Sequence, residues 1–262
     1  MQLPVFHVDA FTSRRFAGNP AAVCPLKAWL DDDTLRLVAA ENNLSETAFF
    51  VPSTDLYELR WFTPSCEVKL CGHATLASAF VIMQFIDKSR ISVRFQTRSS
   101  GMLTVSPDGN LLAMDFPSLP PWPCPNPPKA LLEGLGKQPA CVAQVEDNYF
   151  AVYASAKDVV ELRPDLRLLE KLHPAGVAVT APGDDCDFVS RYFAPSYGIL
   201  EDPVTGSTHC SLAPYWAKRF GKVQLHARQL SERGGELWCE VKEQRIVIKG
   251  QAVLTLQGEM SL

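Results

Sequence analysis

Residues 60–65 read Arg-Trp-Phe-Thr-Pro-Ser, and residues 191–196, an offset of 131 positions, read Arg-Tyr-Phe-Ala-Pro-Ser. Each copy runs on to a glycine followed by small polar residues, at Gly72 in the first copy and at Gly206 in the second. A passage repeated at a fixed offset indicates a repeated architectural unit. We therefore predict two related halves, each containing an aromatic strand, a proline turn, a short extended segment, a glycine and a helix.

The helices expected after the two glycines span residues 76–86 and 211–220. The first turn of a helix exposes backbone N–H groups, which favour an anion. We expect the two helix starts to form the walls of one cleft between the halves. Residues 70–86 carry no formal charge, but this length is at the short limit for a membrane span. A buried core helix is the interpretation we prefer.

The composition is that of an ordinary folded protein. The 262 residues are 47% hydrophobic and 21% charged, with a net charge of −4. Because there is no basic stripe, we expect no nucleic-acid partner. The eight cysteines include no Cys-x-x-Cys pair, and charged residues (Asp9, Arg14 and Arg15) lie where a signal peptide would be apolar. We therefore expect a cytoplasmic protein with reduced thiols and no membrane partner.

A proline-rich connector divides the chain. Residues 117–128 contain seven prolines, which is incompatible with a helix or a central strand. We predict an N-terminal half at residues 1–116 and a C-terminal half at residues 117–262, whose last strand is able to return to the first half. Strand patterns mixed with one core helix per half predict an α+β fold.

Glu46 is the first candidate for chemistry. Strand alternation places it on the same face as Ala48 and Phe50. A carboxyl group on an apolar face is costly to ionise, so we expect its pKa to rise, as suits a general acid/base. The alternative is a register in which Glu46 faces water.

Three further polar residues lie near the two glycines. His73 follows Gly72 and is placed to donate to a bound carboxylate or to relay a proton; the alternative is a capping or core histidine. Ser207 follows Gly206 and is a candidate helix N-cap or anion ligand. A turn would aim Asp202 into the cleft, and the alternative is a solvated acid.

The cysteines and histidines near the glycines raise the question of zinc. Cys66, Cys71 and His73 follow the spacing Cys-x4-Cys-x-His, and residues 209–210 read His-Cys. Neither spacing matches a zinc finger or knuckle, so we predict no metal. A more specific hypothesis is that Cys71 acts as a nucleophile. Its counterpart by position is Thr205, however, and a symmetric two-cysteine racemase needs both thiols, so we expect Cys71 to be a small apolar residue.

Seven blocks of this sequence resemble the phenazine biosynthesis-like (PhzF-type) isomerase family, in order along nearly the whole chain. They are residues 9–12, 18–23, 44–49, 60–64, 70–75, 201–207 and 231–237.

The resemblance implies a diaminopimelate epimerase-like fold, with two similar halves that each wrap a curved, mainly antiparallel sheet around a central helix. It also implies an enzyme without a cofactor. In the best understood member, a glutamate moves a proton within a dihydro-hydroxyanthranilate, and that glutamate corresponds to Glu46. The family's supporting histidine, aspartate and serine correspond to His73, Asp202 and Ser207.

The leading hypothesis is a cofactor-independent isomerase in which Glu46 moves a proton on a small carboxylate-bearing substrate. The substrate carboxylate is expected at the helix starts, near Gly72, Thr205 and Gly206. The alternatives are a cysteine-assisted racemase or epimerase and a non-catalytic binding protein on the same fold. A homodimer is a further expectation.

Overall fold

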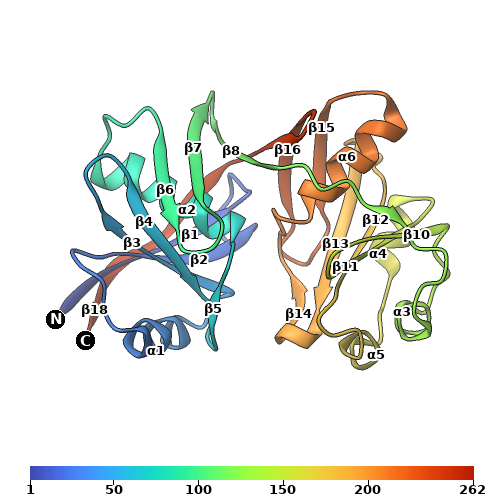
Figure 1. Cartoon of the computed structure of the whole chain (residues 1–262), viewed down its shortest axis with the longest axis horizontal. Helices are drawn as coiled ribbons and strands as arrows, with labels where there is room; N and C mark the ends of the chain where they lie inside the picture. The colour runs from blue at the N-terminus through green and yellow to red at the C-terminus, as the bar shows by residue number, and fades with distance from the viewer. The chain divides into compact units, whose positions relative to one another are not determined.

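The structure is a computed structural model that describes residues 1–262 and consists of two compact units (Figure 1). The N-terminal unit comprises Met1–Phe116 together with Val247–Leu262, and the C-terminal unit comprises Pro117–Ile246. The sequence-based boundary assigned all of residues 117–262 to the second half, apart from a last strand able to return. In the structure the returning segment also includes part of the preceding strand.

The N-terminal unit contains a mixed sheet. β2 is parallel to β3, β4 is parallel to β6, and the remaining neighbours are antiparallel. β5 and β6 pair with opposite ends of β4. The strands are β1 (Gln2–Ala10), β2 (Asn19–Pro25), β3 (Glu46–Pro52), β4 (Tyr57–Phe62), β5 (Glu67–Val68), β6 (Val93–Thr97), β7 (Met102–Asp108), β8 (Leu111–Pro117) and β18 (Ala252–Ser261).

A central helix, α2 (Gly72–Val81), follows β5, continues as a π-helical turn at Ile82–Ile86 and leads to β6. It contacts β1, β2, β3, β7 and β18, and every residue from Gly72 to Ala79 is buried. The hydroxyls of Thr75 and Ser78 donate to carbonyls four residues earlier, at 2.5 and 2.7 Å. The uncharged stretch is therefore a core helix. None of the helices is both long enough and apolar enough to span a membrane.

Helix α1 (Asp32–Asn42) connects β2 to β3 and begins within a run of three aspartates, Asp31 to Asp33. Asp31 is the N-cap, and its carboxylate accepts from the backbone N–H of Thr34 at 2.9 Å. Acidic residues in the first turn complement the helix dipole. The helix ends at Asn43, which adopts the left-handed conformation that asparagine tolerates.

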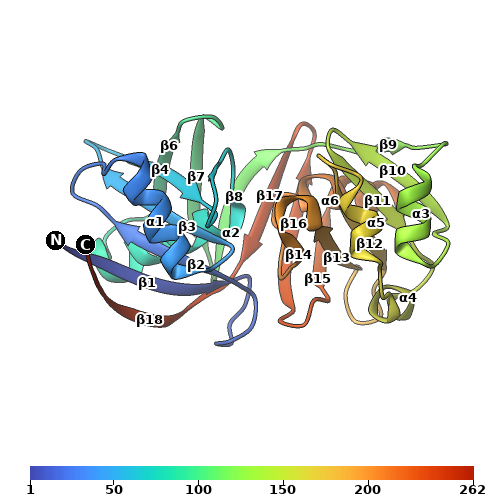
Figure 2. The same ribbon diagram turned by 90° about the horizontal axis from the view of Figure 1, so that it is seen from below.

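The C-terminal unit contains its own mixed sheet and four α-helices (Figure 2). The strands are β9 (Trp122–Pro123), β10 (Cys141–Val145), β11 (Asn148–Val152), β12 (Gly176–Pro182), β13 (Phe188–Ala194), β14 (Ile199–Asp202), β15 (Gln224–Gln229) and β16 (Gly235–Lys242). β17 (Arg245–Gly250) begins in this unit and ends in the N-terminal unit. The helices are α3 (Lys129–Leu135), α4 (Ala156–Glu161), α5 (Leu166–Glu170) and α6 (His209–Phe220), and Pro195–Tyr197 forms a 3-10 turn.

The two units repeat one pattern of strand pairing. β11 is parallel to β12, β12 is antiparallel to β13, and β14 and β15 pair with opposite ends of β13. The sequence β2-β3-β4 with β5 and β6 follows the same pattern. The predicted duplication and the α+β fold of two pseudo-symmetric halves are therefore confirmed.

The proline-rich connector also donates a hydrogen bond to a carbonyl of α6, a helix that contains a proline. Pro214 lies inside α6 and has no N–H to donate to the carbonyl of Cys210, four residues earlier. The backbone N–H of Leu119 donates to that carbonyl instead, at 2.9 Å. This contact allows α6 to continue unbroken through Pro214.

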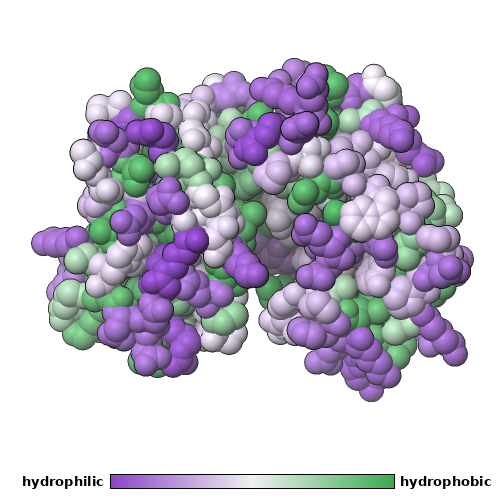
Figure 3. Space-filling model, in the orientation of Figure 1, coloured by the Kyte–Doolittle hydropathy of each residue, from purple (hydrophilic) through white to green (hydrophobic).

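Hydrophilic residues cover much of the face shown in Figure 3, and hydrophobic ones are scattered between them. Each unit has its own apolar core. One cluster contains Leu35, Val38, Phe49 and Phe62 of the N-terminal unit, and another surrounds Val177 in the C-terminal unit.

Candidate active site

Glu46 is the first residue of β3. Phe49 packs in a cluster with Leu35 and Val38 of α1, so alternation turns Glu46 to the opposite face of β3, and α2 also contacts this strand. The Glu46 side chain is 13% exposed. Sequence alternation placed Glu46 on this face, but it did not anticipate that Thr47 on the other face is buried as well.

His73, the second residue of α2, lies between Glu46 and Cys71. Its Nε2 atom is 3.4 Å from Oε2 of Glu46, and its Nδ1 atom is 3.5 Å from Sγ of Cys71. Burial lowers the pKa of His73 to about 3. The ring is therefore neutral at physiological pH despite the neighbouring carboxyl group, because the cost of desolvating an imidazolium dominates.

The neutral ring can link the two neighbouring side chains. A proton on Nε2 would be directed at Glu46, which leaves Nδ1 to accept from the thiol of Cys71. We assign this tautomer from the contacts. The arrangement gives Glu46 a neutral hydrogen-bond donor on one side.

The same three side chains each offer one potential metal-ligand atom, and these atoms lie within 4.8 Å of one another. Carboxylate, thiolate and neutral imidazole are all zinc ligands. The spacing argument missed this grouping because Glu46 comes from a different element. That the protein binds no metal therefore stays a prediction.

Gly72 is the first residue of α2, and Cys71 is its N-cap residue. The Cys71 side chain makes no capping hydrogen bond, and its backbone is extended. The first N–H groups of a helix have no acceptor within the helix. This end of α2 therefore offers a positive dipole end to an anion beside Glu46 and His73.

Asp202, in the C-terminal unit, is the last residue of β14 and is buried. The hydroxyl of Thr205 donates to Oδ2 of Asp202 at 2.5 Å. Gln229, on β15, makes two hydrogen bonds to this turn. Its Oε1 atom accepts from the N–H of Thr205 at 2.9 Å, and its Nε2 atom donates to the carbonyl of Asp202 at 2.8 Å.

Ser207 is exposed and Gly206 is buried in the turn that leads into α6. The prediction of Ser207 as the N-cap is wrong, because the helix starts at His209 with Thr208 as the N-cap residue. The N–H of His209 donates to Gly206 and that of Cys210 donates to Ser207, so one additional turn precedes the helix.

The structure thus brings Glu46, His73 and Cys71 together in the N-terminal unit, and Asp202 and Thr205 together in the C-terminal unit. Sequence reasoning missed two supporting residues, Gln229 and Ser231. The hydroxyl of Ser231 donates to the carbonyl of Pro203 at 2.7 Å. The signal was available, since Ser231 opens one of the blocks that carry the family resemblance.

The chain is similar to proteins described as isomerases or as phenazine biosynthesis-like proteins. A family model described as "Phenazine biosynthesis-like protein" matches residues 8–258. An uncharacterized isomerase of Pseudomonas aeruginosa is 52% identical, with all of both chains covered. A phenazine biosynthesis-like domain-containing protein 2 of Mus musculus is 39% identical, again with full coverage of both chains.

Solved structures of similar fold include a phenazine biosynthesis protein of the PhzF family from Enterococcus faecalis. It is 43% identical, covers all of both chains and has a TM-score of 0.95. A probable proline racemase from Agrobacterium radiobacter matches with a TM-score of 0.65 at 10% identity, covering 99% of this chain and 93% of the other. This second likeness shows the fold alone, and it places the chain among diaminopimelate epimerase-like folds.

Proposed function

Because the chain belongs to the phenazine biosynthesis-like (PhzF) family, we propose that it is a cofactor-independent isomerase that moves a proton on a small carboxylate-bearing substrate. Glu46 is the acid/base in this proposal. The observation that carries it is the 3.4 Å separation between Oε2 of Glu46 and Nε2 of a buried, neutral His73. Relatives named as isomerases support the same class of reaction.

The proposed reaction is an allylic proton shift. Glu46 as carboxylate removes a proton from an sp³ carbon next to a double bond, and the C–H electron pair forms a new C=C bond. Glu46 returns its proton to the carbon at the far end of the allylic system, where the π electron pair of the old double bond forms the new C–H bond. One base that takes and returns the proton favours transfer on a single face of the substrate. No oxidant, reductant or second reactant is needed.

His73 has a supporting role in this proposal. As a neutral donor it stabilises the carboxylate form of Glu46, and it withdraws no proton from the reaction because burial disfavours imidazolium. The start of α2 at Gly72 receives the substrate carboxylate through N–H groups that have no acceptor within the helix.

The proposal also keeps Asp202, Thr205, Gly206 and Ser207 as substrate-contacting residues. Its support is the family resemblance together with two contacts of Asp202, whose carboxylate accepts from the Thr205 hydroxyl and whose backbone carbonyl accepts from Gln229. A cytoplasmic location and a homodimer remain part of the proposal, and size-exclusion chromatography with light scattering tests the dimer.

Isotope exchange tests the function. The purified protein is incubated in D₂O with a dihydro-hydroxyanthranilate and with a panel of small unsaturated carboxylates, and the products are followed by NMR. An isomerase forms the shifted product, and solvent deuterium enters the new C–H position to the extent that Glu46 exchanges its proton with water before returning it. Dialysis against a chelator should leave the rate unchanged, whereas a loss restored by added metal would contradict cofactor independence. No turnover and no exchange on any of these compounds would favour a binding protein.

One contact favours a second candidate, a cysteine-assisted racemase or epimerase. Sγ of Cys71 lies 3.5 Å from Nδ1 of His73, so the thiol is placed to donate a hydrogen bond to this ring beside Glu46. The corresponding position in the other unit is Thr205, whose hydroxyl donates to Asp202. A racemase here would therefore have to pair Cys71 with an acid, and selective alkylation of Cys71 would abolish its turnover.

A further inference from the structure

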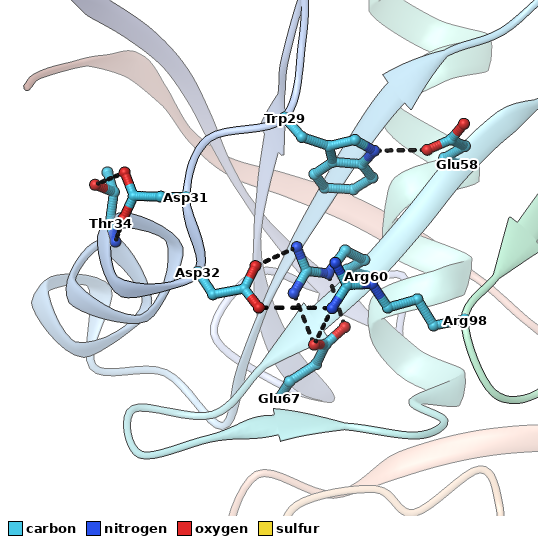
Figure 4. Close-up of polar contacts among 8 residues, drawn as sticks. All are labelled: Trp29, Asp31, Asp32, Thr34, Glu58, Arg60, Glu67 and Arg98. Atoms are coloured by element: carbon cyan, nitrogen blue, oxygen red, sulfur yellow. Dashed lines mark hydrogen bonds and ion pairs between the residues drawn. The ribbon is translucent and has the colours of Figure 1, made fainter.

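The duplicated passage contains the same ion pair in both units. Nε and Nη2 of Arg60, on β4, donate to the two carboxylate oxygens of Glu67, both at 2.7 Å (Figure 4). Nε and Nη2 of Arg191, on β13, donate to the two oxygens of Glu201 at 2.7 and 2.9 Å. We call these two bidentate pairs the arginine clamps. Parallel N–H donors to one carboxylate fix its orientation as well as its position.

The third nitrogen of each guanidinium reaches the connection between the first and second strands of the repeated pattern, β2 to β3 in one unit and β11 to β12 in the other. Nη1 of Arg60 donates at 2.8 Å to Asp32, the first residue of α1. Nη1 of Arg191 donates to the carbonyls of Val159 and Leu162 at the end of α4, at 3.1 and 2.9 Å. Each clamp therefore joins a strand, its partner strand and a crossover helix.

Aromatic stacking repeats as well. The guanidinium carbon of Arg60 lies 4.9 Å from the ring centre of Phe62, and that of Arg191 lies 4.9 Å from the ring centre of Phe193. The Arg60 side chain is 3% exposed and that of Arg191 is 11% exposed. A buried guanidinium that lost its carboxylate would be strongly disfavoured, so each clamp resists opening.

The two glutamates occupy matched positions in the chain. Glu67 and Glu201 each lie five residues before the glycine of their own unit. The residue after the glutamate differs, since Val68 pairs with Trp61 in one unit and Asp202 pairs with Tyr192 in the other. The clamp is thus present in both units, whereas the side chains proposed for chemistry are not.

In the N-terminal unit the arginine clamp joins β4 to β5, which lie in the chain between Glu46 on β3 and His73 on α2. Thr47, next to Glu46, pairs with Phe62 on β4, and Phe62 pairs in turn with Glu67 on β5. The chain then passes from β5 to Gly72 and His73. A shift of β5 against β4 would therefore change the separation of His73 from Glu46.

We propose that Arg60 and Arg191 are positioning residues that hold the segment leading into the glycine motif of their own unit. Arg60 sets the separation between His73 and Glu46, and Arg191 sets the orientation of Asp202. The kinetic consequence rests on the proposed function, whereas the structural consequence does not.

Amide hydrogen exchange, followed by mass spectrometry on the full chain, tests the structural consequence without a substrate. Arg60→Lys keeps the charge but loses the bidentate geometry. Amide exchange in residues 68–76 should be faster by about tenfold or more, because the free energy of local opening falls. Exchange in residues 202–210 should be unchanged. Arg191→Lys should give the reverse pattern. Glu67→Gln, which keeps the shape of the side chain, should repeat the effect of Arg60→Lys.

Arg98→Lys is the matched control. Arg98 also contacts Glu67, at 3.1 Å, but it is 58% exposed and lies outside the duplicated passage. This variant should leave exchange in both segments unchanged. Unchanged exchange in Arg60→Lys, or equal acceleration throughout both units, would overturn the proposal, because the arginine would then have no local role or only a general structural one.

The kinetic arm uses the deuterium-incorporation assay with the same carboxylate probe for all variants. Arg60→Lys should lower kcat about a hundredfold with little change in KM, since a displacement of about 1 Å at the reacting groups has an effect of this size. Unaltered kcat with accelerated local exchange would overturn the role in catalysis. Absence of turnover in the unaltered protein would contradict the proposed function alone, and the exchange data would still decide the clamps.

Discussion

The hydroxyl of Tyr192 occupies the space that a side chain at Gly176 would need, because a Cβ atom there would overlap it. Position 176 is the counterpart of Glu46, since Thr47 pairs with Phe62 just as Val177 pairs with Phe193.

The Tyr192 hydroxyl donates to Oδ1 of Asn148 at 2.8 Å. Burial, and then the charge of Asp202, raises the pKa of Tyr192, so the group stays neutral. The C-terminal unit therefore has a neutral hydroxyl where the N-terminal unit has a carboxyl group. The duplication provides one candidate base rather than two.

Replacing that single carboxyl group should stop the proposed proton transfer. Glu46→Gln keeps the size of the side chain but cannot exchange protons, so turnover should fall by about 10²–10⁴-fold. Deuterium incorporation by NMR measures the rate, and equilibrium dialysis checks that the carboxylate probe still binds. Glu41→Gln, at an exposed position in α1, is the control. A near-normal rate for Glu46→Gln would transfer the role of base to Asp202 or His73.

The thiol beside His73 should be dispensable. A serine at position 71 can still donate to Nδ1 of His73, so Cys71→Ser should keep most of the activity in the same assay. A loss larger than about a hundredfold, the lower end of the effect of an acid/base group, would revive the racemase hypothesis.

His209 should make the protein sensitive to acid. Its Nδ1 donates to the carbonyl of Thr205 at 2.9 Å, and burial lowers its pKa to about 4. An unfolded histidine titrates near pH 6.5, so the unfolded state binds more protons between pH 6.5 and 4. The contribution of neutral His209 to the free energy of unfolding is complete above pH 6.5, and it is lost as the pH falls from 6.5 to 4.

His209→Asn retains an N–H donor for Thr205 but does not titrate. Urea unfolding at a series of pH values should show a slope of unfolding free energy against pH that is shallower by about one proton between pH 4 and 6.5. His173→Asn, an exposed histidine, should leave the slope as it is. Equal slopes for His209→Asn and the unaltered protein would contradict the assignment.

Gln229 should stabilise the turn that holds Asp202. Gln229→Leu leaves the buried N–H of Thr205 without its acceptor, and the free energy of unfolding should fall by about 1–3 kcal/mol. Urea denaturation measures the change, with Gln224→Leu at an exposed position of the same strand as control. A stability equal to that of the control would mean that the turn does not depend on Gln229.

The duplication and a buried core helix were readable from the sequence, because repetition and apolar composition are local signals. The helix was expected at residues 76–86 and lies at residues 72–81, followed by the π-helical turn at residues 82–86. The family resemblance and the fold it implies are confirmed. The contact of Glu46 with His73 was expected only through the resemblance, since it depends on the pairing of separate strands. Ser207 was misjudged as the N-cap because the additional turn at residues 206–208 has no strong sequence signal.

Strand β18 has a consequence for how the protein is made. It pairs with β1 from Gln2 opposite Ser261 to Ala10 opposite Ala252, so two segments that are far apart in the sequence are neighbours in one sheet. The C-terminal unit is contiguous in the chain, and all its residues are translated before β18. The N-terminal unit, although most of it is translated earlier, completes its sheet only after β18 has left the ribosome. Until then β1 is an unprotected sheet edge, which is the kind of surface through which nascent chains aggregate.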